Sequence, residues 1–302
     1  MRKRSTVFLL AIQVILFTSG HNAGARIRKG LRVYISVDME GIAGVCASDQ
    51  VSASGRDYHM ARMWTTRETN AAIQGALDAG ATEILVNDSH GSMRNIIAHE
   101  LNPAARLITG SPKPLGMMQG IDRTFQAALF IGYHARAGSI NGVLDHTYSS
   151  AAVYSIKING LEVGESELNA ILAGHFGVPV ALVAGDREVC RQVKEMLGDQ
   201  VLTVEVKEGI GRHAASTLVP AEAQKQIREK TREALENLHA MKPFQLSGPY
   251  TFEIDFLYSW QADAAELIPG VERTAPRSIL YTQDDFLEGF RLFRALLVLA
   301  RP

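Results

Sequence analysis

The chain has 302 residues, of which 46% are hydrophobic and 21% are charged, and its formal net charge is −1 at pH 7. These are the values of a soluble globular protein that is long enough for one large or two ordinary domains. Beyond residue 25 the sequence has no basic run and no aromatic residues interleaved with Lys or Arg, which argues against a nucleic-acid partner.

The first 25 residues have the pattern of a secretory signal peptide. A basic start, MRKR, precedes the apolar stretch TVFLLAIQVILF, and Ala23-Gly24-Ala25 has the small residues of a cleavage site. We expect cleavage after Ala25 and a secreted or periplasmic chain with no stable membrane association. An uncleaved membrane anchor is the alternative, but the apolar stretch is short for one. We expect Cys46 and Cys190 to be buried thiols, since two distant cysteines do not make a disulfide framework.

The first predicted strand is Arg32–Asp38, a short run of β-branched and aromatic residues. It ends in Asp38, and Glu40 follows one residue later, directly before Gly41. Charged groups are costly to bury unless they are paired or bind a metal. The simpler interpretation is a solvent-exposed strand end, because Asp and Gly are common turn residues.

Strand and helix patterns then alternate along the chain. The predicted elements are a helix over 56–80, a strand over 82–90, a strand over 127–135, a hairpin over 154–165, a helix over 165–177 and a strand over 179–186. The hairpin is indicated by Asn159-Gly160, a tight-turn pair between alternating residues. This alternation predicts an α/β fold with a mainly parallel sheet covered by helices.

The pattern changes beyond about residue 200. The predicted elements there are a strand over 200–209, a charged helix over 221–241, a strand over 250–257 and an amphipathic closing helix over 284–300. We predict a metal-binding catalytic α/β domain over residues 31–195 and a smaller α+β domain over residues 196–302. The boundary is soft, and interwoven domains are the alternative.

Polar side chains follow four of the predicted strands. Asp38 and Glu40 follow the first, His90 the second, His134 the third and Asp186 the fourth. The carboxyl ends of parallel strands share one edge of an open sheet, and ligands bind at that edge. Two carboxylates and two imidazoles there predict a metal site. Mixed nitrogen and oxygen ligands suit zinc, with manganese or cobalt as alternatives.

Six blocks of sequence occur together in a recognisable order. They are SVDMEG, VNDSHGSM, LITGSPKPLGMMQGID, ALFIGYHARAG, GVLDHTY and INGLEVGESELNA. In these blocks the chain resembles the zinc-dependent D-aminopeptidases of the dipeptide-operon (DppA) type, and the resemblance extends over nearly the whole chain from about residue 32.

The resemblance implies a dinuclear site with two zinc ions per subunit, in which Asp38 bridges the metals. The other implied ligands are Glu40, His90, His134 and Glu165, and the implied catalytic histidine is His146. From the residues alone, Glu165 would be an acid placed at a helix start by the helix dipole, and His146 an exposed loop residue. Asp88 is expected to orient a histidine ligand or to form a turn at the strand end.

The implied activity is hydrolysis of the N-terminal D-amino acid, such as D-alanine, from short D-amino-acid-containing peptides. The preference for D-residues rests on the resemblance alone. The alternatives are a metal-dependent hydrolase of other amide or phosphoester substrates and a non-catalytic peptide-binding protein. The resemblance also implies a homo-oligomer, such as a decamer. The apolar helix Phe286 to Leu299 would either supply an interface or pack on its own sheet.

Overall fold

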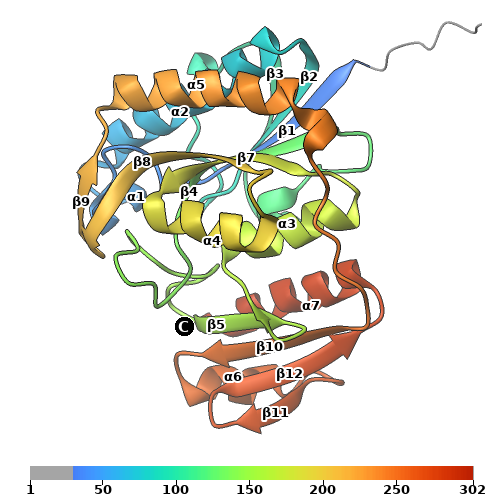
Figure 1. Cartoon of the computed structure of the whole chain (residues 1–302). Helices are drawn as coiled ribbons and strands as arrows, with labels where there is room; N and C mark the ends of the chain where they lie inside the picture. Colours follow the sequence, from blue (N-terminus) through green and yellow to red (C-terminus); the bar gives the residue numbers. More distant parts are fainter. Residues whose placement is uncertain (1–29, 302) are drawn as a thin grey trace, which may run out of the picture.

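The computed structural model describes residues 30–301, and the predicted signal peptide lies outside that range. Two β-sheets with helices around them form the molecule (Figure 1). The larger sheet is mainly parallel and the smaller sheet is antiparallel, which confirms the predicted fold class. Within residues 30–301, no helix combines the length and the apolar character needed to cross a membrane.

The larger sheet contains seven strands. They are β1 (Leu31–Val37), β2 (Ala81–Asp88), β3 (Ala105–Ile108), β4 (Ala127–Tyr133), β7 (Val180–Asp186), β8 (Leu202–Gly211) and β9 (Ala214–Thr217). Their order is β3-β2-β1-β4-β7-β8-β9, and only β9 is antiparallel to its neighbour. Because β1 pairs with β2 on one side and β4 on the other, the strand order reverses beside β1. Open α/β sheets bind ligands at such a switch point, beyond the carboxyl ends of the strands.

Helices cover both faces of this sheet (Figure 1). The helices are α2 (Tyr58–Asp78) and α5 (Pro220–Glu236) on one face, and α3 (Glu165–His175) and α4 (Arg187–Leu197) on the other. The side chains of β1 alternate between the two cores. Val33, Ile35 and Val37 join the core beside α2 and α5, and Tyr34 joins the core on the opposite face. Burial on both faces explains why β1 reads as a nearly continuous apolar run.

The smaller sheet assembles segments that are distant in the sequence. Its strands are β5 (Val153–Ile158), β6 (Leu161–Glu162), β10 (Tyr250–Phe256), β11 (Glu272–Ala275) and β12 (Ser278–Gln283), and its helices are α6 (Ser259–Ala265) and α7 (Phe286–Leu299). The predicted hairpin corresponds to β5 and β6, with Asn159 and Gly160 at φ 52° and 77° in the turn. The buried face of α7 packs Phe286, Phe290 and Phe293 into the core of its own sheet.

The expected boundary at residue 195 does not separate the two sheets. β8 pairs in parallel with β7, so the larger sheet continues to Thr217, and α5 packs on α2. In the other direction, β5 leaves the first half of the chain to pair with β10. An alternating strand pattern shows which face is buried but does not show which sheet supplies the partner. The segments of the two sheets interleave along the chain, as in the alternative of interwoven domains.

The sequence pattern did not predict several short elements. These are α1 (Ser48–Val51), α4, β3, β9, β11, β12, α6 and the 3₁₀ turns Ala98–Glu100, Gly116–Met118 and Leu238–Ala240. Cys190 is buried and Cys46 is partly buried, and both are free thiols. The expectation of unpaired cysteines is therefore confirmed, and that of burial only for Cys190.

Candidate functional site

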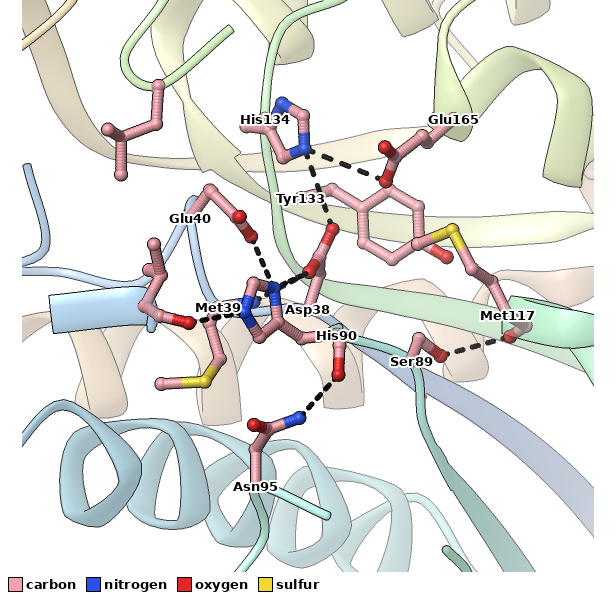
Figure 2. Close-up of polar contacts among 12 residues, drawn as sticks. Asp38, Met39, Glu40, Ser89, His90, Asn95, Met117, Tyr133, His134 and Glu165 are labelled. Atoms are coloured by element: carbon pink, nitrogen blue, oxygen red, sulfur yellow. Dashed lines mark hydrogen bonds and ion pairs between the residues drawn. The ribbon is translucent and has the colours of Figure 1, made fainter. Parts of the chain in front are cut away.

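The six predicted site residues converge at the carboxyl edge of the larger sheet. Figure 2 shows four of their ion pairs, which connect residues that follow β1, β2 and β4 with the start of α3. The members of the site are Asp38 and Glu40 after β1, His90 after β2, His134 after β4, His146 in the loop before β5, and Glu165 as the first residue of α3. These residues form two adjacent groups, each compact enough to hold a metal ion.

Asp38 lies between the two groups. Its Oδ1 is 3.2 Å from Nδ1 of His90, and its Oδ2 is 3.7 Å from Nε2 of His134. Glu40 belongs to the first group, because its Oε2 is 2.9 Å from the same Nδ1 of His90. One oxygen of Asp38 therefore faces each group, which is the placement that a bridging carboxylate requires.

The second group contains His134, His146 and Glu165. Oε2 of Glu165 is 3.6 Å from Nε2 of His134, and Oε1 is 3.5 Å from Nε2 of His146. The two imidazole rings stack with their centroids 4.3 Å apart. Glu165 also accepts a hydrogen bond of 2.7 Å from the backbone N–H of Tyr148, which fixes the carboxylate to the loop that carries His146.

A main-chain carbonyl orients each of the three imidazoles. The outer ring nitrogen lies 2.7 to 2.9 Å from a carbonyl oxygen, in the pairs His90 Nε2 with Val51, His134 Nδ1 with Ala135 and His146 Nδ1 with Leu144. A carbonyl only accepts hydrogen bonds, so each outer nitrogen carries the proton. In the neutral ring, the inner nitrogen then presents its lone pair to the carboxylates.

This arrangement fits a metal cation. A bare imidazole nitrogen and a carboxylate repel one another unless a proton or a metal ion lies between them. Within residues 30–301, the buried Nε2 of His134 and the buried Oε2 of Glu40 have no hydrogen-bond partner of good geometry. Nδ1 of His90 lies only 2.9 Å from Oε2 of Glu40, but this contact does not have the geometry of a hydrogen bond. Imidazole and carboxylate donors at such distances are the ligands that zinc takes.

The protonation of the metal-free site follows from the same contacts. Burial lowers the pKa of His134, but the carboxylates around it, Glu165 first, outweigh burial and raise the pKa to about 10. Burial also lowers the pKa of His90, but the carboxylates of Glu40 and Asp38, Glu40 first, outweigh burial and raise this pKa well above its ordinary value. Burial raises the pKa of Glu165, but the charge and hydrogen bond of His134, together with the charge of His146, outweigh burial and lower the pKa to about 2. Protons therefore hold the place of the cation in the metal-free protein.

Two further acids position the loops of the site. We expected Asp88 to orient a histidine ligand or to form a turn at the strand end, and its carboxylate accepts hydrogen bonds from Asn95 and from the backbone N–H of Ile96. Asn95 in turn donates to the carbonyl of His90 at 2.7 Å, so Asp88 acts on the backbone of His90 and not on its ring. Asp186 caps α4 and accepts a hydrogen bond from the backbone N–H of Ala135, next to His134.

Sequence reasoning missed a buried lysine below the site. Nζ of Lys207, on β8, donates to the main-chain carbonyls of Glu40, Ile42 and Val45. Glu68 of α2 fastens the same loop by accepting a hydrogen bond of 2.9 Å from the backbone N–H of Ala43. Lys207 had no usable signal in the sequence, because strand alternation puts it on the polar face with Glu205. For Glu68 the signal was weak, an acid inside a predicted helix.

The site opens into a cavity of 410 Å³, a normal size for a small-molecule pocket. Its lining includes Asp38, Glu40, His90, His146 and Glu165, and also the three arginines Arg212, Arg294 and Arg301. A larger hollow of 920 Å³ lies between α2 and α5. Charged helix surfaces line most of it, and it contains none of the predicted site residues, so we assign the chemistry to the smaller cavity.

Known proteins share both the sequence and the fold. A family model for D-aminopeptidases of peptidase family M55 matches residues 31–295. The chain belongs to this D-aminopeptidase family. The D-aminopeptidase of Bacillus subtilis (strain 168) is 40% identical over 271 residues, which cover 89% of this chain and 98% of the relative.

A solved structure of the same family has the same fold. It is the Zn-dependent D-aminopeptidase DppA from Bacillus subtilis, described as a self-compartmentalizing protease. The TM-score is 0.87 at 39% identity, and the match covers 89% of this chain and 98% of that one. The M55 family match therefore spans both sheets and all six site residues.

Proposed function

We propose that this protein is a zinc-dependent aminopeptidase that removes a D-residue, such as D-alanine, from the amino end of short peptides. One observation carries the proposal: three imidazoles are aimed by main-chain carbonyls at carboxylates in two groups that share Asp38. Membership of the D-aminopeptidase family and the zinc dependence of its solved relative support the substrate class and the metal.

The proposed ligand set holds two zinc ions. Glu40 and His90 would serve one ion and His134 and Glu165 the other, with one oxygen of Asp38 directed to each. A bound pair of this kind supplies Lewis acidity, which activates water and polarises a peptide carbonyl. The protein contributes fixed ligand orientations, because main-chain carbonyls and the buried Lys207 hold the loops in place.

His146 is proposed to transfer the proton. Its Nδ1–H is held by the carbonyl of Leu144, so Nε2 is the nitrogen that accepts or donates a proton on the cavity side. A ring in this position can take a proton from the attacking water and return it to the leaving amine. Because its Nε2 is also close to Glu165 and its ring stacks on His134, His146 lies within reach of the ligands it would assist.

The decisive test is metal analysis of the purified protein together with release of alanine from D-Ala-D-Ala and from L-Ala-L-Ala. We expect about two zinc ions per chain and D-selective release. Bound metal with hydrolysis only of other amides or phosphoesters would overturn the substrate assignment. Tight peptide binding without turnover by the zinc-loaded protein would instead support a binding protein.

The bridging role of Asp38 has its own test. We expect Asp38→Ala to lose both metal ions, because each group would lose a shared ligand and Glu40 and His90 alone make a poor site. Metal content measured by mass spectrometry checks this, with Asp263→Ala on exposed α6 as the control. An Asp38→Ala protein that retains two zinc ions would contradict the bridge.

We also propose that the protein acts outside the cytoplasm as a homo-oligomer. The signal-peptide pattern at residues 1–25 supports export, and the intact mass of exported protein, with Arg26 as its first residue, checks it. The solved relative is a self-compartmentalizing protease, which supports assembly. The side chains of Ile140 and Ile210 are 85% and 72% exposed on neighbouring segments, which is costly for a lone subunit.

A further inference from the structure

Arg294 brings an unsatisfied positive charge to the cavity that contains the site. It lies on α7, which belongs to the smaller sheet, and it lines the same cavity as Asp38 and Glu165. The side chain is partly buried. Its Nε is fully enclosed and has no hydrogen-bond partner within residues 30–301, where Arg294 also forms no ion pair. A guanidinium withdrawn from water in this way is unfavourable unless an anion satisfies it.

The neighbouring cations already have partners, so they do not need the same anion. Arg212 pairs with Asp145, and Nζ of Lys113 donates to Oδ1 of Asn87 and to the carbonyl of Asp88, both at 2.6 Å. Arg212 lines the same cavity as Arg294, and Lys113 lies next to it. All three side chains are positively charged, but of the three only Arg294 lacks a partner within residues 30–301.

A second arginine strengthens the positive potential at this place. Arg301 follows Arg294 by seven residues, about two helical turns, and lines the same cavity. The charge of Arg301 contributes, after burial, to lowering the pKa of Arg294. Within residues 30–301 neither arginine forms an ion pair, and two such cations lining one cavity favour an anion there.

The backbone leaves room for this guanidinium. Gly116 has φ 52°, and a Cβ atom added there would lie only 3.1 Å from Cζ of Arg294.

α7 is also fixed relative to the metal-binding groups. The Tyr148 ring packs edge-on against Phe293 with centroids 5.0 Å apart, and its backbone N–H bonds to Glu165. The arginine is therefore held at a set place in the cavity.

We propose that Arg294 binds the carboxylate of the C-terminal residue of the peptide substrate, and that the enzyme thereby selects short peptides with a free C-terminus. This inference rests on the proposed function. A short peptide is a zwitterion, and one cavity of 410 Å³ offers the proposed metal site for its amino end and Arg294 for its carboxylate. The planar fork of a guanidinium matches a carboxylate with two parallel hydrogen bonds.

The test compares D-Ala-D-Ala with its C-terminal amide. The wild-type enzyme should prefer the free acid, and Arg294→Met should reduce the ratio of the two kcat/KM values by about 10- to 100-fold, mainly through KM for the acid. Methionine retains the packing of the arginine stem. Arg294→Lys, which keeps the charge but loses the fork, should recover part of the ratio. Arg291→Met is the matched control, because Arg291 is exposed on the same helix and pairs with Glu288.

Binding without turnover gives an independent measurement. In zinc-loaded His146→Ala protein, calorimetry should show weaker binding of D-Ala-D-Ala when Arg294→Met is added, and an unchanged affinity for the amide. Zinc content and assembly mass of each variant are measured alongside.

Three results would overturn the proposal: an unchanged ratio, an equal loss on both substrates, or a change of assembly mass with Arg294→Met. The last result would assign Arg294 to a contact between subunits. A wild-type protein that hydrolyses neither peptide would instead reject the proposed function itself, so the two failures are distinguishable.

Discussion

His146 is the site residue with the most open environment. Its side chain is 18% exposed, whereas that of His134 is 1% exposed, and its outer nitrogen is bonded to the carbonyl of Leu144. This exposure suits a residue that meets substrate, whereas the enclosed ring of His134 suits a ligand. The structure places Nε2 of His146 near Glu165, so a contribution to metal binding is the competing role.

Substitution separates these roles. We expect His146→Ala to lower kcat by about 10²- to 10⁴-fold, the usual contribution of a general acid or base, with zinc content unchanged because the other five residues remain. Steady-state kinetics and metal analysis measure the two effects. His239→Ala, which alters an exposed histidine on another surface, is the control. Loss of zinc in His146→Ala would assign it to the ligand set.

The raised pKa values of His90 and His134 predict how zinc binding depends on pH. Carboxylates raise the pKa of His134 to about 10 and that of His90 well above its ordinary value, so both rings are protonated in the metal-free protein at neutral pH. Zinc must displace these protons, and its apparent affinity should therefore rise about 100-fold per pH unit between pH 6 and 8.

Calorimetry in two buffers of different ionisation enthalpy counts the displaced protons. We expect about two protons released per chain as the site fills. Uptake of zinc without proton release would mean that the inner nitrogens are already bare in the metal-free protein, contrary to the contacts described above.

At the scale of elements, the site depends on a connection between three segments. Lys207 of β8 binds the carbonyls of the loop that follows β1, and Glu68 of α2 binds Ala43 in the same loop. Both side chains are buried. Burial raises the pKa of Glu68 to about 7 and lowers that of Lys207 to about 8, so each charge is held at a cost.

Glu68 should therefore make stability depend on pH. Its pKa is about 7 in the folded protein and near the ordinary glutamate value of 4.5 when unfolded. As pH rises from about 4.5 to 7, the unfolded chain loses this proton first, so the free energy of unfolding should fall by up to about 3 kcal/mol. Glu68→Gln should remove this decline, which urea unfolding of metal-free protein at pH 5 and pH 7 measures. The exposed Glu229→Gln is the control, and an identical decline in wild type and Glu68→Gln would contradict the prediction.

Comparing the predicted with the observed elements shows which parts of the fold and of the site local sequence patterns can predict. Five strands of the larger sheet, β1, β2, β4, β7 and β8, followed from local patterns, whereas β3 and β9 did not. The positions of Asp38, His90 and His134 followed as well, because parallel strands bring their carboxyl ends to one edge. Glu165 and His146 came only from family resemblance, since a helix start and a loop have simpler explanations. The pairing of β5 with β10 and the reach of Lys207 across the fold depend on contacts far apart in the sequence, which local patterns do not encode.

At the scale of the whole molecule, two exposed isoleucines lie close together on one face, which is the face we propose for assembly. Ile140 lies in the loop before His146 and Ile210 near the tip of the hairpin formed by β8 and β9, and Gly209 packs directly on Asn141. Arg212, on the same hairpin, lines the cavity. Assembly through this face would place a neighbouring subunit beside the cavity mouth and limit the size of peptides that enter.

We expect Ile210→Asp to reduce the assembly to smaller species, because a carboxylate would be buried in the interface without a partner. Light scattering coupled to size-exclusion chromatography measures the mass. Leu267→Asp, which changes an equally exposed residue beyond α6, tests whether the effect is specific to this face. An unchanged mass for Ile210→Asp would exclude the hairpin as the interface.

The carbonyls that hold the three imidazoles also have a bearing on mutational tolerance. Val51, Ala135 and Leu144 contribute only their main-chain oxygens to the ring nitrogens. Every amino acid carries that oxygen, so no single-codon change at these positions deletes the acceptor. In enzymes whose ligands are oriented by carboxylate side chains, one point mutation can erase the partner. Here the orientation of the proposed metal ligands depends on the path of the chain, so a substitution at any of the three positions keeps the acceptor in place as long as that path is kept.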